Sequence, residues 1–153
     1  MKNKILTIAS LFVLGLGTSY AQEIAQNQVP DVIQTSFQQK FPKASDIEWE
    51  KEGNLYKVEF EIGWSQDYDA WYDARGNLVK YKAEVAEKDL PAAITNAIKS
   101  NYPVYKIDDA DMYVENGKTV YKIEIEKADE KRDIYLDKNG KTVKGLLNFN
   151  TIK

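Results

Sequence analysis

Histidine and cysteine, which many enzymes use for nucleophilic and metal-dependent catalysis, are both absent from this sequence of 153 residues. The chain therefore cannot form Ser-His-Asp or Cys-His arrangements, and it lacks the ligands that zinc and copper prefer. With 24 Asp and Glu residues, an acid/base pair of the glycosidase type has to be considered. The best-placed carboxylates alternate along two expected strands, which is typical of a solvated strand face; they are Glu59, Glu61, Glu124 and Glu126. We therefore expect a protein that is not an enzyme.

Two acidic segments could instead supply oxygen ligands for calcium. Asp137-Lys138-Asn139-Gly140 begins like an EF-hand loop, in which oxygens at alternate positions bind the ion and a glycine bends the chain. The distal glutamate of such a loop has no counterpart, because its position falls on Asn148. A plain hairpin turn explains the same residues. The sequence leaves both interpretations open, with calcium as the one cofactor considered; the candidate ligands are Asp108, Asp109, Asp111, Asp137 and Asn139.

The N-terminal residues have the pattern of an export signal. Two lysines lie within the first four residues, and the stretch Ile5–Leu16 is almost wholly apolar. Ser19-Tyr20-Ala21 then offers the small-x-small pattern of a cleavage site. We expect residues 1–21 to be a signal peptide and the mature protein to be periplasmic or secreted, without a membrane span. A retained membrane anchor is the alternative, but the apolar stretch is shorter than the ~20 residues that span a bilayer.

The charge balance restricts the class of partner. Removal of residues 1–21 takes away two of the 21 basic residues, leaving 19 against 24 acidic ones and a net charge near −5. Nucleic acid is not expected as a partner, because its phosphates require a basic surface. Since there is no cysteine, no disulfide contributes to stability outside the cytoplasm. The expected partner is an unidentified envelope or secreted protein or peptide.

An internal repeat organises the rest of the chain. Val29-Pro30 is followed by apolar residues four positions apart, and Leu90-Pro91 starts the same pattern 61 residues later. This spacing predicts a helix of about three turns with one apolar stripe. Proline suits the first helical turn, and a second proline, Pro42 or Pro103, stops each helix. The apolar positions are Ile33, Phe37 and Phe41 in the first copy and Ile94, Ile98 and Tyr102 in the second.

Each predicted helix is followed by a repeated pattern of strands. Alternation of apolar and charged residues predicts half-buried strands at Tyr56–Glu61 and Tyr121–Glu126. The next block in each copy is a short strand that enters an Asp-x-x-Gly turn. Opening strands are expected at Ile47–Lys51 and Ala110–Val114, and closing strands at Leu78–Lys82 and Thr142–Lys144.

The predicted fold class is therefore α+β, with two tandem repeats that each consist of one helix followed by a four-stranded antiparallel sheet. The predicted boundaries are residues 22–83 for the first repeat and 84–153 for the second. The connection between them is short, so we expect the two units to pack together with their sheets side by side. The segment Leu146–Lys153 is compatible with either a final strand or a disordered tail.

The order of helix, proline and strands, the two Asp-x-x-Gly turns and the export signal resemble the PepSY-like periplasmic proteins, whose fold is similar to the tandem beta-lactamase inhibitor protein. The resemblance covers residues 29–82 and 90–144. It implies a binding or inhibitory role, since related modules occur in propeptides of secreted peptidases. No residue-by-residue match to an inhibitor's contact loop is present, so the resemblance implies no inhibition of a beta-lactamase.

The pleat of the predicted sheet suggests where a partner would bind. If the apolar residues of each alternating strand face the helix, an aromatic residue flanked by two aspartates faces outward in both copies. Two aromatics, Trp64 and Tyr68, are expected in or beside the loop 63–67, where binding residues are frequent. A purely stabilising role for Trp71, packed on lysine side chains, is the alternative. The candidate partner-binding residues are Trp64, Tyr68, Asp69, Trp71, Asp73, Tyr113, Asp133 and Tyr135.

Overall fold

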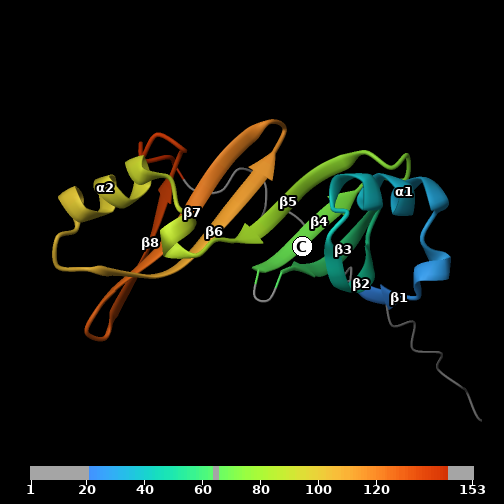
Figure 1. The fold of residues 1–153 in the computed structure, drawn as a ribbon, viewed down its shortest axis with the longest axis horizontal. Helices are drawn as coiled ribbons and strands as arrows, with labels where there is room; N and C mark the ends of the chain where they lie inside the picture. The colour runs from blue at the N-terminus through green and yellow to red at the C-terminus, as the bar shows by residue number, and fades with distance from the viewer. Residues whose placement is uncertain (1–20, 64–65, 145–153) are drawn as a thin grey trace, which may run out of the picture.

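The computed structural model describes residues 21–63 and 66–144, which form one eight-stranded antiparallel sheet and two α-helices (Figure 1). Strands that follow one another in sequence lie next to one another in the sheet. The strands are β1 (Gln22–Ile24), β2 (Ala44–Glu52), β3 (Leu55–Ile62), β4 (Gln66–Tyr72), β5 (Leu78–Glu84), β6 (Lys106–Glu115), β7 (Lys118–Lys127) and β8 (Glu130–Leu136). The helices are α1 (Asp31–Lys40) and α2 (Ala92–Asn101), with short 3-10 turns η1 (Gln26–Gln28) and η2 (Glu87–Asp89).

The first helix begins and ends where its prolines predict. Pro30 stands at the N-cap of α1 with extended backbone angles, and the last helical residue lies two positions before Pro42. The apolar stripe of α1 packs on an aromatic core, with Phe37 at its centre. The Phe37 ring lies 5.4 Å from the ring of Trp49 and 5.0 Å from that of Phe60, both in edge-to-face geometry.

The second helix repeats this arrangement over a different kind of core. Ile94 and Ile98 of α2 are buried against Ile123 and Ile125 of β7, so aliphatic packing replaces the aromatic cluster. Pro91 at the N-cap again precedes the helix. The predicted helices and their apolar stripes are therefore confirmed.

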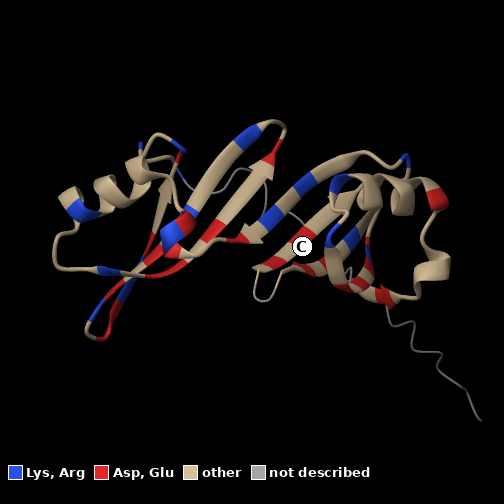
Figure 2. Ribbon diagram, viewed as in Figure 1, with Lys and Arg blue, Asp and Glu red and all other residues tan. Residues whose placement is uncertain are grey.

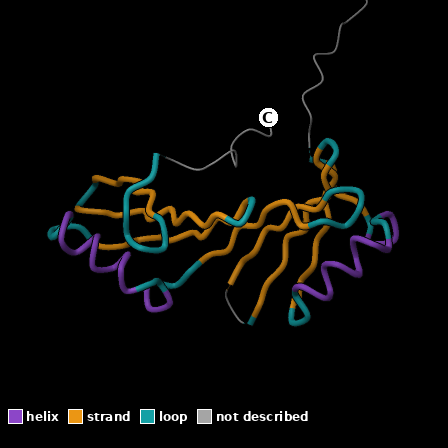
Figure 3. The backbone as a smooth tube through the Cα atoms, turned by 90° about the horizontal axis from the view of Figure 1, so that it is seen from above, coloured by secondary structure: helices purple, strands orange, loops and turns teal. Residues whose placement is uncertain are grey.

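The two halves are joined through their sheets. β5 pairs with β6 from Lys80 opposite Glu115 to Glu84 opposite Asp111, which makes one continuous sheet. Figure 3 shows both helices on the same side of that sheet. The expectation of sheets lying side by side is confirmed in its strongest form, because the two sets of strands are hydrogen-bonded to each other.

The prediction of two four-stranded sheets is wrong in detail. β1, too short to show periodicity in the sequence, adds to the free edge of β2. The closing strand expected at Thr142–Lys144 is represented only by an isolated bridge between Leu136 and Thr142. The bridge lies directly before the end of the described chain. Within residues 21–63 and 66–144, three full strands follow α2 and four follow α1. The predicted strand or disorder at Leu146–Lys153 lies outside the described residues.

The predicted signal peptide also falls almost entirely on residues that the structure does not describe. Within residues 21–63 and 66–144, neither helix has the length and apolar character needed to cross a membrane.

The two Asp-x-x-Gly turns pack against the helices. Gly76 and Gly140 have φ angles of +83° and +75°. A Cβ on Gly76 would lie 2.9 Å from the carbonyl oxygen of Val32 in α1, and one on Gly140 would overlap the carbonyl oxygen of Ala93 in α2. Each turn therefore needs glycine for two reasons: the left-handed backbone and the close approach of the helix.

A matched pair of glycine substitutions separates these two reasons. Gly117 has a similar φ of +73° but nothing within 4 Å of an added Cβ. Gly117→Ala should lower the free energy of unfolding by about 1 kcal/mol, from backbone strain alone. Gly140→Ala should add ~1–3 kcal/mol of overpacking to a similar strain. Urea unfolding followed by tryptophan fluorescence measures both, and equal losses would contradict the close packing of the turn on α2.

Candidate functional site

The side of the sheet opposite the helices, which we call the open face, contains most of the predicted binding residues. In β4, Ala70 and Tyr72 belong to the core beneath α1. Because side chains alternate along a strand, Asp69 and Trp71 lie on the open face. The orientation predicted from the sequence is therefore confirmed in the first half of the chain.

Trp71 is on the open face but does not protrude from it, since only 9% of its surface is exposed. Its indole N–H donates a 2.8 Å hydrogen bond to the carboxylate of Glu52. The ammonium groups of Lys80 and Lys57 lie 4.6 and 5.8 Å from the ring centroid, within the range of a cation–π interaction. Both lysines are directly opposite Trp71 in the neighbouring strands. These contacts agree with the alternative interpretation from the sequence, in which Trp71 packs on lysine side chains.

Lys57 is the centre of the ion pairs on this part of the face. Its ammonium lies 3.4 Å from Glu50 and 3.7 Å from Asp69, and it also donates a hydrogen bond to Glu59. Burial by itself would lower the pKa of Lys57, but the bond to Glu59 and the nearby carboxylates raise it above the ordinary value. Burial raises the pKa of Asp69, although the charge of Lys57 opposes the rise. Sequence reasoning did not find this role of Lys57, which depends on strand register.

A second ion pair lies where the two halves meet. Asp111 of β6 is 5% exposed, and its carboxylate lies 3.0 Å from the ammonium of Lys82 on β5. The hydroxyl of Tyr113 donates a 3.3 Å hydrogen bond to the same carboxylate. Burial, together with the charge of Asp111, raises the pKa of Tyr113. Two predicted residues of β6, Asp111 and Tyr113, thus contact each other, and Asp111 links β6 to β5 through Lys82.

Two adjoining hollows in the sheet surface form what we call the acidic groove. Their volumes are about 450 and 210 Å³, and Asp67, Asp69 and Lys82 line both. Among the described residues that line it, Lys82 is the one basic residue. Figure 2 shows the acidic residues along these strands in red. The carboxylates are those of Asp46, Glu48, Glu59, Glu61, Asp67, Asp69, Glu84, Asp109 and Asp111.

The two predicted aromatics around the loop 63–67 have different outcomes. Tyr68 is not a loop residue, because it lies within β4. Its ring stacks on Phe60 at 5.2 Å, although the residue also lines the acidic groove. The strand starts two residues earlier than the sequence suggested. Trp64 lies outside the described residues.

The second half repeats the aspartate–aromatic arrangement in a more open form. Leu136 is buried beneath α2, which places Tyr135 and Asp133 on the open face. Lys122 stands opposite Tyr135 in β7, and its ammonium lies 3.3 Å from Asp133. Burial would lower the pKa of Lys122, but Asp133 raises it above the ordinary value. Tyr135 is half-buried, so it is better able than Trp71 to meet a partner.

The remaining aspartates of the repeated pattern close turns. One carboxylate oxygen of Asp73 accepts hydrogen bonds from the backbone N–H groups of Arg75 and Asn77, at 2.9 and 3.0 Å. Asp137 accepts the same two bonds from Asn139 and Lys141, at 2.8 and 3.0 Å. These bonds are typical of aspartate in hairpin turns.

The five calcium candidates are not brought together. Asp108 pairs with Lys131 at 2.6 Å, Asp111 pairs with Lys82, and Asp137 closes its turn. Asp109 lines the acidic groove. Within the part of the chain that the structure describes, no three carboxylate, histidine or cysteine side chains gather in a way that could hold a metal ion. The hypothesis of calcium binding at these residues therefore rests on the sequence pattern.

Hydrogen bonds that the carboxylate of Asp73 accepts from Asn77 lower its pKa to about 2, against an ordinary value of 3.8. A carboxylate with a lowered pKa stabilises the fold above its ordinary pKa, and this contribution is lost as the pH falls toward the folded-state value. Asp73→Ala should therefore lower the melting temperature at pH 7, and its deficit relative to wild type should shrink between pH 4 and pH 2. A deficit that does not change over this range would show that the charge of Asp73 is not responsible.

Calcium binding is tested directly by calorimetry on metal-stripped protein. If Asp137 and Asn139 act only in a hairpin turn, titration should give no heat and no rise in melting temperature at millimolar calcium. Asp137→Asn should then have the same thermal behaviour with and without calcium. A calcium-dependent rise that Asp137→Asn abolishes would instead establish the cation site.

The sequence comparison and the structure comparison indicate the same family. Residues 18–80 and 59–144 each match the family model described as "Putative beta-lactamase-inhibitor-like, PepSY-like". The two matches overlap, so the predicted boundary between residues 83 and 84 stays a prediction. Among curated proteins, none matches the chain.

Several solved structures share the fold. A BLIP-like protein from Bacteroides fragilis is 24% identical with a TM-score of 0.63, and the alignment covers 74% of this chain and 82% of that one. A DUF2874 family protein from Bacteroides ovatus is 21% identical, with the same TM-score and coverages of 75% and 84%. A Bacteroides eggerthii structure, described under "putative periplasmic proteins", has 18% identity, a TM-score of 0.64 and coverages of 76% and 86%. At these identities the likeness shows the fold alone.

The family matches together extend over residues 18–144, well over half of the chain. The fold agrees with them, since it is similar to that of a structure described as BLIP-like, with a TM-score of 0.63. This chain belongs to the PepSY-like, beta-lactamase-inhibitor-like family.

Proposed function

We propose that this protein is a non-catalytic, exported binding module that engages a protein or peptide through the open face of its sheet. The observation that supports this most directly is the acidic groove, which crosses the strands of both halves on the side away from the helices. The family description as inhibitor-like supports a binding role, and the structure described as periplasmic supports export. The two repeats, 22–83 and 84–153, are proposed to act as one unit.

The groove favours a partner segment with positive charge. Nine carboxylates and one lysine line it, while the whole sequence has a net charge of only −3. Two of the exposed carboxylates, Glu48 and Asp67, have no ion-pair partner among the described residues. Concentrated charge of one sign steers an oppositely charged partner and rejects one of like charge. We therefore propose a segment rich in lysine or arginine as the contacting element.

Aromatic residues at the same face would add contact area. Tyr135 and Tyr113 are half-buried, so their rings keep exposed surface beside the ion pairs. Tyrosine at a protein interface combines an apolar ring with a polar end. Trp71 contributes indirectly, because it holds Lys57 and Lys80 in place beside the groove.

The test replaces charge in the groove without touching the ion pairs that stabilise the sheet. Glu48→Lys with Asp67→Lys should abolish recovery of the partner from envelope extract, because the change reverses two of the carboxylates that would contact it. Recovery by the wild-type protein should fall as salt is raised, since exposed charges are screened. Quantitative mass spectrometry of the captured proteins measures both effects.

The matched control makes the same charge change on the surface near α2. Glu87→Lys with Asp89→Lys alters two exposed carboxylates of η2, outside the groove. It should recover the same partners as wild type. Identical recovery by the groove variant, the control and wild type would remove the open face from consideration as the binding surface.

A further inference from the structure

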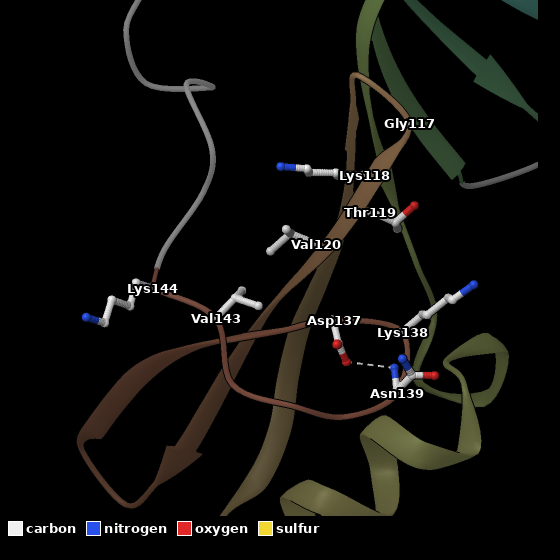
Figure 4. A pocket seen from close by; sticks show the side chains of 9 residues that line it. All are labelled: Gly117, Lys118, Thr119, Val120, Asp137, Lys138, Asn139, Val143 and Lys144. Atoms are coloured by element: carbon white, nitrogen blue, oxygen red, sulfur yellow. Dashed lines mark hydrogen bonds between the residues drawn. The ribbon is translucent and has the colours of Figure 1, made fainter.

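A third hollow, with basic instead of acidic residues at its rim, lies at the start of β7 beside the turn that follows β8 (Figure 4). Its volume is about 510 Å³, a size typical of small-ligand sites. We call it the lysine pocket. Its lining consists of Gly117, Lys118, Thr119, Val120, Asp137, Lys138, Asn139, Val143 and Lys144.

The wall of the lysine pocket is apolar where it meets the sheet. Val120 is only 6% exposed, yet it is not part of either core cluster. It pairs with Tyr113 of the neighbouring strand β6 and lies on the open face. Val143 is held beside it, because its backbone N–H donates a 2.9 Å hydrogen bond to the carbonyl of Tyr135. Figure 4 shows the two valine side chains close together between the lysines.

The rim of the pocket is basic. Lys118, Lys138 and Lys144 are exposed, and none of them forms an ion pair with any residue that the structure describes. The sheet lysines that do pair, such as Lys82 and Lys122, lie 3.0 and 3.3 Å from carboxylates. Among the described residues of the lining, the one carboxylate is that of Asp137, and backbone hydrogen bonds within its turn occupy one of its oxygens. The described residues of the lining, with three lysines and one aspartate, therefore carry a net charge of +2.

This pocket is not simply repeated from the first half of the chain. Lys80 and Lys144 occupy equivalent positions of the repeat. Lys80 is two residues after Leu78, which pairs with Tyr72, and Lys144 is two residues after Thr142, which bridges to Leu136. Yet Lys80 is 4% exposed and covers the ring of Trp71, whereas Lys144 is exposed at the pocket rim. The same position of the repeat thus stabilises the sheet in one half and is available for a ligand in the other.

We propose that the lysine pocket binds a carboxylate attached to an apolar group. The apolar group would contact Val120 and Val143, and the carboxylate would accept hydrogen bonds from lysine ammonium groups. Figure 4 shows Lys118 and Lys144 on the same side as the two valines, whereas Lys138 extends to the other side. We therefore assign Lys118 and Lys144 to the carboxylate. Such a ligand could be a free carboxylic acid or the C-terminal residue of a peptide. The site is separate from the acidic groove, which would repel an anion.

The experiment titrates the mature protein with octanoate, with octanamide as the uncharged match, and with N-acetyl-leucyl-leucine as a peptide carboxylate. Two-dimensional amide NMR should show octanoate shifting the signals of Lys118, Val120 and Val143. Lys118→Gln and Lys144→Gln should each weaken octanoate binding about two- to fivefold, as expected for exposed ion pairs. Lys99→Gln, an exposed lysine on α2, should leave it unchanged.

The peptide arm identifies the source of the carboxylate. Tighter binding of N-acetyl-leucyl-leucine than of octanoate points to a peptide end, and the reverse order points to a free acid. Three results would each overturn the proposal. Octanamide could bind as tightly as octanoate, Lys99→Gln could weaken octanoate binding as much as the pocket variants do, or neither carboxylate could shift the amide signals. None of these results would affect partner recovery through the acidic groove, so the two proposals can fail independently.

Discussion

The pairing of β5 with β6 is the constraint on which the rest of the structure depends. It makes one sheet from two sets of strands, and its register places Ala83 opposite Met112 on the helix side and Lys82 opposite Tyr113 on the open face. Because inward residues face inward residues across the junction, both helices must cover the same side. A shift of one residue would have placed the halves with opposite faces exposed. The open face is continuous over the whole sheet for this reason, and the acidic groove can extend from β2 to β6.

Charge on the open face is divided between structural and available groups. Lys57, Lys82 and Lys122 each form ion pairs with carboxylates. These pairs link neighbouring strands on the face that no helix covers. Exposed ion pairs contribute little each, but Asp111 is nearly buried, so losing Lys82 would leave its carboxylate with the Tyr113 hydrogen bond and without the ion pair to Lys82. The unpaired carboxylates of the groove, Glu48 and Asp67, and the lysines of the lysine pocket form no ion pair with any described residue. Binding is most economically assigned to these.

The sequence predicted the elements whose signal is local. Prolines at positions 30, 42, 91 and 103 and apolar residues four apart located both helices, and strict alternation located β3 and β7 with the correct faces. The sequence left open that Trp71 packs on lysine side chains, but the strand register was needed to identify them: Lys80 and Lys57 flank Trp71 because they stand opposite it in neighbouring strands. The lysine pocket was missed for the same reason, since Val120 and Val143 are 23 positions apart and meet through the turn after β8. β1 was missed because three residues show no period.

Divergence between the halves indicates how one framework can provide two different surfaces. The turns at Asp73 and Asp137 keep the same hydrogen bonds, and Gly76 and Gly140 each approach a helix closely. The positions that fix the backbone are therefore alike in both halves. The cores differ, aromatic in one half and aliphatic in the other, yet both fill the space beneath one helix. The two halves differ in charge at positions whose side chains point away from the core. An acidic groove and a lysine pocket on one sheet follow from the physics of such a repeat, because outward positions can change charge without disturbing the packing that defines the fold.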